Sequence, residues 1–227
     1  MSQVETLYAQ IRQIVRPIEQ RVFEHEFFHN LEGKLYSKHQ VAFLPKEEFY
    51  INASDLRSAE HLMIRFGQSS ANQFFHDLVE GERFALANVV TLAEALGCKK
   101  EELEQYQPDA YAQAYPAYFA WLALQGSEAE VIVALAASFS VWWTNCGRVA
   151  MALKSLYGVP AEATAFLTPF NLVPPPDSPL DDLTYAVLES GLKKGVPAEK
   201  IIRAARLIQS YELFFWDSLA RSAAELK

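Results

Sequence analysis

A single carboxylate lies within an aromatic run near the end of the chain. The segment Tyr211-Glu212-Leu213-Phe214-Phe215-Trp216 surrounds Glu212 with large apolar side chains. If a helix turns Glu212 inward, burial raises the pKa of the carboxyl toward values useful for acid–base catalysis. The alternative is a surface glutamate whose aromatic neighbours pack on the opposite face of the helix. Periodicity alone favours neither interpretation.

A second candidate is the segment His25-Glu26-Phe27-Phe28-His29, which has the H-E-x-x-H form of a zinc peptidase site. On a helix, histidines four residues apart share a face and can bind zinc, with the intervening glutamate as general base. A zinc site needs a third protein ligand, and the other histidines, at 39, 61 and 76, have no spacing that supplies one. We interpret the pair as polar histidines at a helix end, and we expect no bound metal and no cofactor.

His76, Glu80 and Glu82 form a further cluster on one predicted helix. Imidazole and carboxylates on neighbouring turns of a bundle can bind iron or manganese. The E-x-x-H order of such sites is absent, and no second motif faces the cluster. A polar stripe is therefore the preferred interpretation.

Trp142-Trp143-Thr144-Asn145 lies at the end of the longest apolar stretch. Adjacent helical residues point about 100° apart, so one tryptophan can face the core while the other lines a cavity. Asn145 would need a hydrogen-bond partner in such surroundings. Core packing with one satisfied amide explains the pattern equally well.

The elements that position these residues are predicted to be helices, because no alternating strand pattern is present. Ser127 and Glu130 have the spacing of a capping box, Gly97 and Gly158 are typical of helix ends, and Pro174-Pro175-Pro176 predicts a rigid connector. Ser178 is predicted to cap a helix with Pro179 at its first position. We expect helices over 2–28, after Ser37, and over 55–66, 70–96, 108–125, 127–157, from Pro179, and 198–225.

Half of the 227 residues are apolar (51%) and 13% are aromatic, so the chain can bury a large core. The formal net charge is −8, and nucleic acids or anionic membranes require concentrated positive charge, so we expect neither as a partner. The two cysteines lie far apart, no signal peptide is visible, and the apolar stretch 131–143 is shorter than the roughly 18–20 residues of a membrane span. We expect a cytoplasmic protein with one domain over residues 1–227.

Four segments together carry a resemblance to a known family. They are Gly81-Glu82-Arg83 through Gly97, Ala114-Tyr115-Pro116-Ala117-Tyr118 before Gly126, the helix ending Asn145-Cys146-Gly147, and Tyr211-Glu212 followed by Phe215-Trp216. The last is similar to the C-terminal Y-E-x-x-F-W of the TenA (thiaminase II-like) family of the heme-oxygenase-like superfamily. The resemblance implies an all-α, heme-oxygenase-like helical bundle around a central pocket, and activity on aminopyrimidines derived from thiamin.

The resemblance also assigns site residues. It places the family's acid at Glu212, a pocket tyrosine at Tyr115, and the pyrimidine-holding aspartate at Asp55. Glu212 and Tyr115 are thus the candidate catalytic residues, and a small heterocyclic molecule in an internal pocket is the expected ligand. We also expect a homo-oligomer, either a dimer or a tetramer.

The chain departs from the family in its buried helix, which usually reads P-C-x-W-x-Y-x-E-I-G. Aligned through Gly147, the sequence has Phe139 at the nucleophilic cysteine, Trp143 at the tyrosine and Asn145 at the glutamate. We take these three, with Asp55, as candidate substrate-binding residues. Cys146 is offset from the family cysteine, and in its apolar run we expect it to be structural.

Three functions remain open. The preferred one is an aminopyrimidine hydrolase, in which Glu212 moves a proton, Tyr115 orients the ring, Trp143 stacks on it, and water replaces the missing thiolate. The second is a non-catalytic ligand-binding or scaffold member of the superfamily. The third is a PqqC-like cofactor-free oxidase of a bulky ring compound. The superfamily also contains di-iron oxidases, which need histidine ligands that include a D-x-x-H-type pair near the seventh helix. No histidine lies between residues 166 and 195, so the resemblance disfavours di-iron chemistry.

Overall fold

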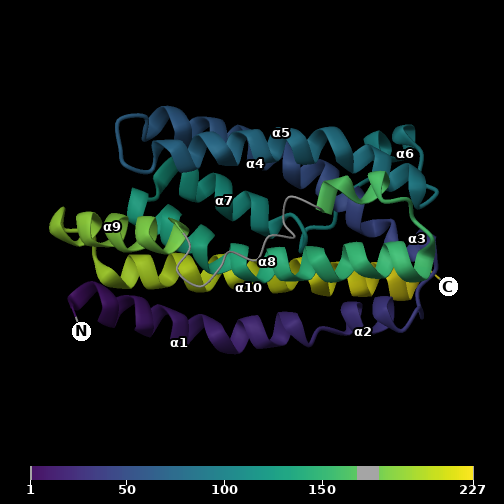
Figure 1. Cartoon of the computed structure of the whole chain (residues 1–227), viewed down its shortest axis with the longest axis horizontal. Helices are drawn as coiled ribbons and strands as arrows, with labels where there is room; N and C mark the ends of the chain where they lie inside the picture. Colours follow the sequence, from purple (N-terminus) through teal and green to yellow (C-terminus); the bar gives the residue numbers. More distant parts are fainter. Residues whose placement is uncertain (1, 168–178, 227) are drawn as a thin grey trace.

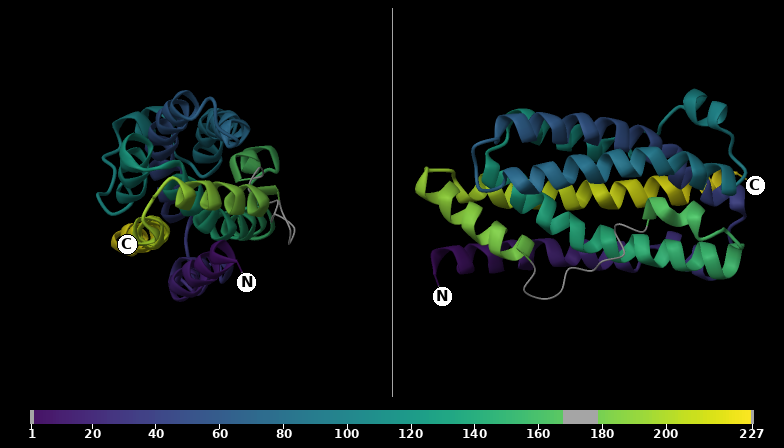
Figure 2. Two further views of the ribbon diagram at one scale, coloured as in Figure 1. Left: turned by 90° about the vertical axis from the view of Figure 1, so that its left-hand side faces the viewer. Right: turned by 45° about the horizontal axis from the view of Figure 1, so that its top comes forward.

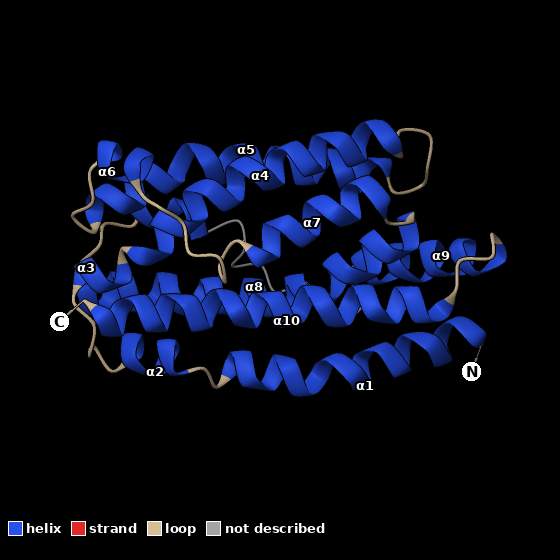
Figure 3. Cartoon of the chain, turned by 180° about the vertical axis from the view of Figure 1, so that it is seen from behind, coloured by secondary structure: helices blue, strands red, loops and turns tan. Residues whose placement is uncertain are grey.

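Helices dominate the computed structural model, which describes residues 2–167 and 179–226. In this part of the chain 82% of the residues are helical and no strand is present (Figure 3). The elements are α1 (Gln3–Phe23), α2 (Glu26–Glu32), α3 (Lys38–Val41), α4 (Phe43–Arg65), α5 (Asn72–Ala95), α6 (Lys100–Gln105), α7 (Ala114–Gln125), α8 (Glu128–Tyr157), the 3-10 helix η1 (Glu162–Leu167), α9 (Pro179–Lys193) and α10 (Ala198–Glu225).

Helix α8 shows how the local sequence sets an element. The Ser127 side chain accepts a hydrogen bond from the Glu130 amide, and the Glu130 carboxylate accepts one from the Ser127 amide, which completes the predicted capping box. Gly158 ends the helix in the left-handed conformation at φ 63°. By length and mean hydropathy α8 could cross a membrane, but 67% of its most apolar window is buried in the bundle, as in the core helix of a soluble protein.

The long helices form layers (Figure 1). The antiparallel pair α4 and α5 makes one layer, and α4 also packs on α7. Helix α10 packs on α8, α7 and α1, while η1 packs on α5 and α8. Viewed along the bundle, α4 and α5 lie on one side and α1 lies on the other (Figure 2).

The core consists of two apolar clusters, one toward each end of the bundle. The first surrounds Trp216, Phe27 and Phe28 and takes the last halves of α8 and α10. The second surrounds Phe75 and Phe119 and takes the first halves of the same helices. Between the clusters, α4, α5, α8 and α10 each present polar side chains. The fold thus leaves a polar boundary across the middle of an apolar bundle.

Several predicted boundaries are wrong. The first helix ends at Phe23, because His25 caps a new helix and the bend brings Phe27 and Phe28 against Trp216. Helix α4 begins at Phe43 instead of residue 55, and α7 begins at Ala114 instead of 108.

Other boundaries agree with the sequence. The capping serine before α3 and the bounds of α10 are confirmed. Helix α6 and η1 were not expected from the sequence. Ser178 and the triple proline lie outside the described residues.

Candidate functional site

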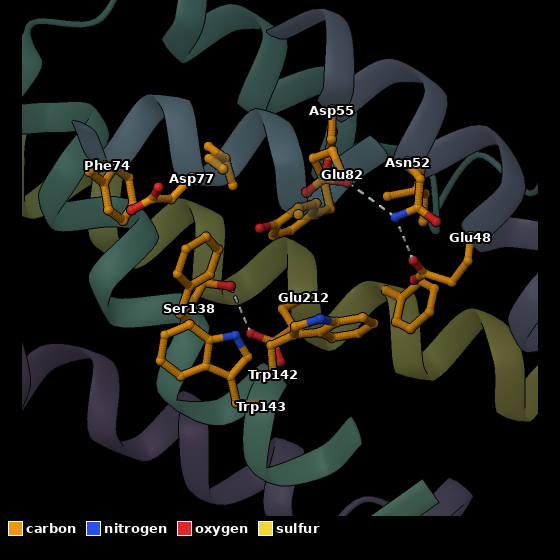
Figure 4. A pocket seen from close by; sticks show the side chains of 16 residues that line it. Glu48, Asn52, Asp55, Phe74, Asp77, Glu82, Ser138, Trp142, Trp143 and Glu212 are labelled. Carbon is orange, nitrogen blue, oxygen red and sulfur yellow. Dashed lines mark hydrogen bonds between the residues drawn. The ribbon is translucent and has the colours of Figure 1, made fainter. Parts of the chain in front are cut away.

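A cavity of about 370 Å³ lies at the polar boundary, between the α4–α5 layer and the pair α8–α10 (Figure 4). Pockets of this size are large enough for a small ring compound. Its walls are aromatic, and most of its polar groups are acids. The lining residues are Glu48, Ile51, Asn52, Asp55, Phe74, Asp77, Leu78, Gly81, Glu82, Tyr115, Ser138, Phe139, Trp142, Trp143, Glu212 and Phe215.

Glu212 occupies one side of the cavity. Its side chain comes from the inward face of α10 and is 2% exposed. Its Oε2 accepts hydrogen bonds from Ser138 Oγ at 3.1 Å and from Gln209 Nε2 at 2.9 Å, while its Oε1 has no partner among the described residues. Burial raises the pKa of Glu212 to about 8, although these hydrogen bonds oppose the rise. The carboxyl therefore holds a proton at neutral pH.

Tyr115 lies at the start of α7, and an anchored loop sets its position. Buried Glu47 on α4 accepts hydrogen bonds from Tyr106 Oη at 2.6 Å, from the Asp109 amide at 2.9 Å and from Gln113 Nε2 at 3.0 Å. These bonds attach the segment before α7 to α4. Tyr115 thereby reaches the cavity beside the Ser138 hydroxyl.

The phenol of Tyr115 lies among acids. Burial and then the negative charge of Asp55 raise its pKa well above the usual range, so it remains a hydrogen-bond donor. Because Ser138 interacts with both Tyr115 and Glu212, one hydroxyl joins the two candidate catalytic residues.

A group of acids occupies the opposite side of the cavity (Figure 4). Glu48, Asn52 and Asp55 share one face of α4, and Glu82 approaches from α5. Asn52 Nδ2 lies 3.4 Å from Glu48 Oε2 and 3.3 Å from Glu82 Oε2.

Each acid in this group holds its proton more tightly than usual. Burial, followed by the charge of Glu82, raises the pKa of Asp55 well above its usual range, and the same two causes act on Glu48. Burial raises the pKa of Glu82 to about 7.

Aromatic rings form the remaining wall. The Phe139 ring lies 5.3 Å from the Trp143 ring and 6.2 Å from the Phe74 ring, measured between centroids. Trp142 lines the cavity and also packs on Phe215 and Trp216. Both tryptophans therefore face the cavity, and Trp142 joins it to the core. A planar heterocycle would find stacking surfaces here.

The structure brings together five of the six residues proposed from the sequence: Asp55, Tyr115, Phe139, Trp143 and Glu212. Asn145 does not line the cavity, which corrects its assignment as a substrate-binding residue. It is fully buried on α8, and its Oδ1 accepts a hydrogen bond from Arg148 at 3.3 Å. Nor does Asn145 hold Glu212, whose partners are Ser138 and Gln209.

The H-E-x-x-H segment does not form a zinc site. His25 is the N-cap of α2 and has extended backbone, so the two histidines do not sit on one face of a continuous helix as the zinc motif requires. Its Nδ1 accepts a hydrogen bond from the Phe27 amide, and its Nε2 lies 3.1 Å from Asp217 Oδ1. His76 and Glu80 are exposed, whereas Glu82 faces the cavity. No group of His, Cys, Asp or Glu within residues 2–167 and 179–226 is arranged to hold a metal.

Cys146 lies behind the cavity and does not line it. It is 1% exposed, and burial, with the nearby carboxylates of Glu48 and Glu212, raises its pKa well above the usual range. A thiol in this state is a poor nucleophile.

Sequence reasoning missed Glu48, Asn52, Ser138 and Trp142. The spacing of Glu48, Asn52 and Asp55 was a usable signal, because residues at i, i+4 and i+7 share a helix face. It went unused because the predicted helix began only at residue 55.

Residues 12–158 match the model of the TENA/THI-4/PQQC family. A TenA homologue from Pseudomonas syringae pv. tomato superposes with a TM-score of 0.74 at 14% identity, over 94% of this chain and 92% of that one. A domain of unknown function with a heme oxygenase-like fold from Shewanella denitrificans superposes with a TM-score of 0.72 at 12% identity, over 94% of this chain and 91% of that one. A putative TenA-like thiaminase from Sulfolobus solfataricus superposes with a TM-score of 0.53 at 12% identity, over 98% of both chains. No curated protein matches the chain. At these identities the likenesses show the fold, which is the heme-oxygenase-like helical bundle.

Proposed function

Because the chain belongs to the TENA/THI-4/PQQC family, we propose that it is a TenA-type hydrolase of aminopyrimidines derived from thiamin, working without a cysteine nucleophile. The observation that carries the proposal is the state of Glu212. It is a buried carboxyl that lines the cavity and has a pKa of about 8, and one of its oxygens has no hydrogen-bond partner among the described residues. An acid of this kind can deliver a proton to a leaving group near neutral pH.

The proposed reaction replaces an amine on the carbon next to the ring with a hydroxyl. Glu212 gives its proton to the leaving nitrogen as the C–N bond breaks. A water molecule then forms the C–O bond and returns a proton to Glu212. The balance is R–CH2–NH2 + H2O → R–CH2–OH + NH3, and no oxidant or reductant is needed.

The other residues bind and orient the ring in this proposal. Trp143 and Phe139 offer stacking faces, and Tyr115 donates a hydrogen bond from its protonated phenol. Ser138 orients the Glu212 carboxyl through the bond at 3.1 Å. Asp55 would accept an N–H group of the ring at the opposite side.

A non-catalytic ligand-binding protein is the competing proposal. The observation in its favour is Phe139, which occupies the wall where the resemblance puts the nucleophilic cysteine. Phe139 argues against catalysis by a thiol at this position. It is compatible with the hydrolase proposed here, because water acts there as the nucleophile.

The test uses a 4-aminopyrimidine with a 5-aminomethyl group, with ammonia release and the alcohol product measured together. The wild-type protein should form both in equal amounts. Glu212→Gln should lower kcat by about 100-fold or more, the usual contribution of a general acid, whereas Glu80→Gln on the exposed face of α5 should not. Binding of this compound without ammonia release by the wild type would favour the non-catalytic protein.

A further inference from the structure

The acid group across the cavity from Glu212 is short of positive charge. It contains Glu48, Asp55 and Glu82, and the hydrogen bonds donated to this group among the described residues come from Asn52, which donates to Glu48 and Glu82. Among the described lining residues there is no lysine, arginine or histidine. Burying carboxylates without a cation is costly unless they keep their protons. The arrangement therefore favours a ligand that brings the missing charge.

Unpartnered atoms in the same place point to a ligand. Asp55 Oδ1 and Asn52 Oδ1 are buried and have no hydrogen-bond partner among the described residues, and both side chains line the cavity. Each residue is 5% exposed. Buried acceptors are nearly always satisfied in native proteins, so these two oxygens have room for N–H donors from a bound molecule.

The surroundings of these acids suit an organic cation better than a metal ion. The described acids are not arranged as a metal site, while the aromatic rings of Trp142 and Phe74 border the same cavity. A planar cation with several N–H groups can use both surroundings, since carboxylates accept charge-assisted hydrogen bonds and aromatic faces attract cations.

We propose that Glu82, positioned by Asn52, binds a positively charged N–H group of the ligand beside Asp55, so that the pocket selects cationic rings over neutral or anionic ones. The proposal rests on the proposed function in taking this cavity as the substrate site, and it adds the charge of the substrate. A protonated aminopyrimidine has the required amidinium edge. A phosphorylated one would bring negative charge to a cavity that already holds several acids, and it should bind poorly.

The position of Glu82 makes the proposal specific. Figure 4 shows Glu82 next to Asp55 and across the cavity from Glu212, so a ring between them would have its charged edge on one side and its leaving group on the other. Glu82 belongs to α5, whereas Asp55 belongs to α4. A cation would thus be held by both helices of one layer.

The experiment compares three probes of nearly equal shape: benzamidine as a cation, benzamide as a neutral ring and benzoate as an anion. Isothermal titration calorimetry at neutral pH measures their affinities for the wild-type protein. Benzamidine should bind at least about tenfold more tightly than benzamide, and benzoate should bind most weakly. Glu82→Gln should remove most of the preference for benzamidine and leave benzamide within about twofold. Glu80→Gln, two residues earlier on the exposed face of α5, should change neither.

Three outcomes would overturn the proposal: equal binding of benzamidine and benzamide by the wild type, no measurable binding of benzamidine, or an unchanged preference in Glu82→Gln. Stoichiometric binding of Zn²⁺ or Mn²⁺ that Glu82→Gln abolishes would also do so, because the partner would then be a metal. A thermal melt of each variant establishes that it is folded. If the preference depends on Glu82 but no ammonia is released, the hydrolase proposal fails and this one stands. If ammonia is released but the preference for benzamidine does not depend on Glu82, the hydrolase proposal stands and the proposal for Glu82 fails.

Discussion

Glu212 should make the protein less stable as the pH rises, and Glu212→Gln should remove that dependence. The pKa of the carboxyl is about 8 in the folded protein, against an ordinary value of 4.5. A raised pKa means that the folded protein holds the proton after the unfolded chain has released it. Stability is therefore complete below pH 4.5, falls as the pH rises, and stops falling above about pH 8.

The magnitude follows from the difference between the two pKa values. One pKa unit corresponds to 1.36 kcal/mol, so between about pH 5 and pH 8 the ionisation of Glu212 lowers the free energy of unfolding by about 3–4 kcal/mol. Glutamine has nearly the same shape and carries no charge. Relative to the wild type, Glu212→Gln should therefore gain about 3–4 kcal/mol over this range.

The measurement is urea unfolding followed by circular dichroism at several pH values. The variant is compared with the wild type at each pH, so that the other buried acids, which are common to both proteins, cancel. Glu80→Gln is the matched control, because its carboxyl is exposed on α5. A difference between Glu212→Gln and the wild type that stays constant from pH 5 to 8 would refute the reasoning, since it would mean that Glu212 ionises normally in the fold.

Three further predictions concern individual residues. If Glu212 is the proton donor, the activity on the aminomethyl aminopyrimidine should fall above about pH 8, the pKa of Glu212, and a rate that still rises there would contradict the role. Cys146→Ser should leave kcat within about threefold, because the buried thiol lies outside the cavity; loss of activity in a folded variant would make it catalytic. His25→Ala should lower the free energy of unfolding by about 1 kcal/mol through loss of the α2 cap, with no change in metal content by mass spectrometry; loss of a stoichiometric metal would restore the zinc interpretation.

The parts of the site that could be predicted lie on helices with clear sequence signals. Helix α10 follows Pro197 and is strongly amphipathic, so its bounds were accessible from the sequence. The inward direction of Glu212 was not, because periodicity alone left both faces open and only the family resemblance placed Glu212 in the pocket. Helix α8 has a capping box, and alignment through Gly147 placed Phe139 and Trp143 on the correct face.

The parts that could not be predicted depend on packing. Helix α4 has no side-chain cap at Ala42 and carries Pro45 in its first turn, so its start gives little signal, although proline is tolerated there because the first amides lack partners anyway. Without that start, Glu48 and Asn52 could not be assigned to the face that holds Asp55. The assignment of Asn145 to the substrate site was wrong for another reason. Periodicity gives the direction of a side chain around the helix, but the position along α8 where the cavity ends depends on what the facing helices bring to it.

The location of the cavity between two apolar clusters explains why its acids are perturbed together. The clusters supply the hydrophobic stabilisation, and the boundary between them collects the buried Glu48, Asp55 and Glu212 with the partly buried Glu82. Each of these acids has a raised pKa with burial as the main cause, so each weakens the fold as the pH rises. A sequence selected for stability alone would place apolar side chains there. The four acids, with the Asn52 amide between Glu48 and Glu82, fit the ligand proposed above, which would take the proton of Glu212 on one side of the cavity and place its positive charge beside the other acids.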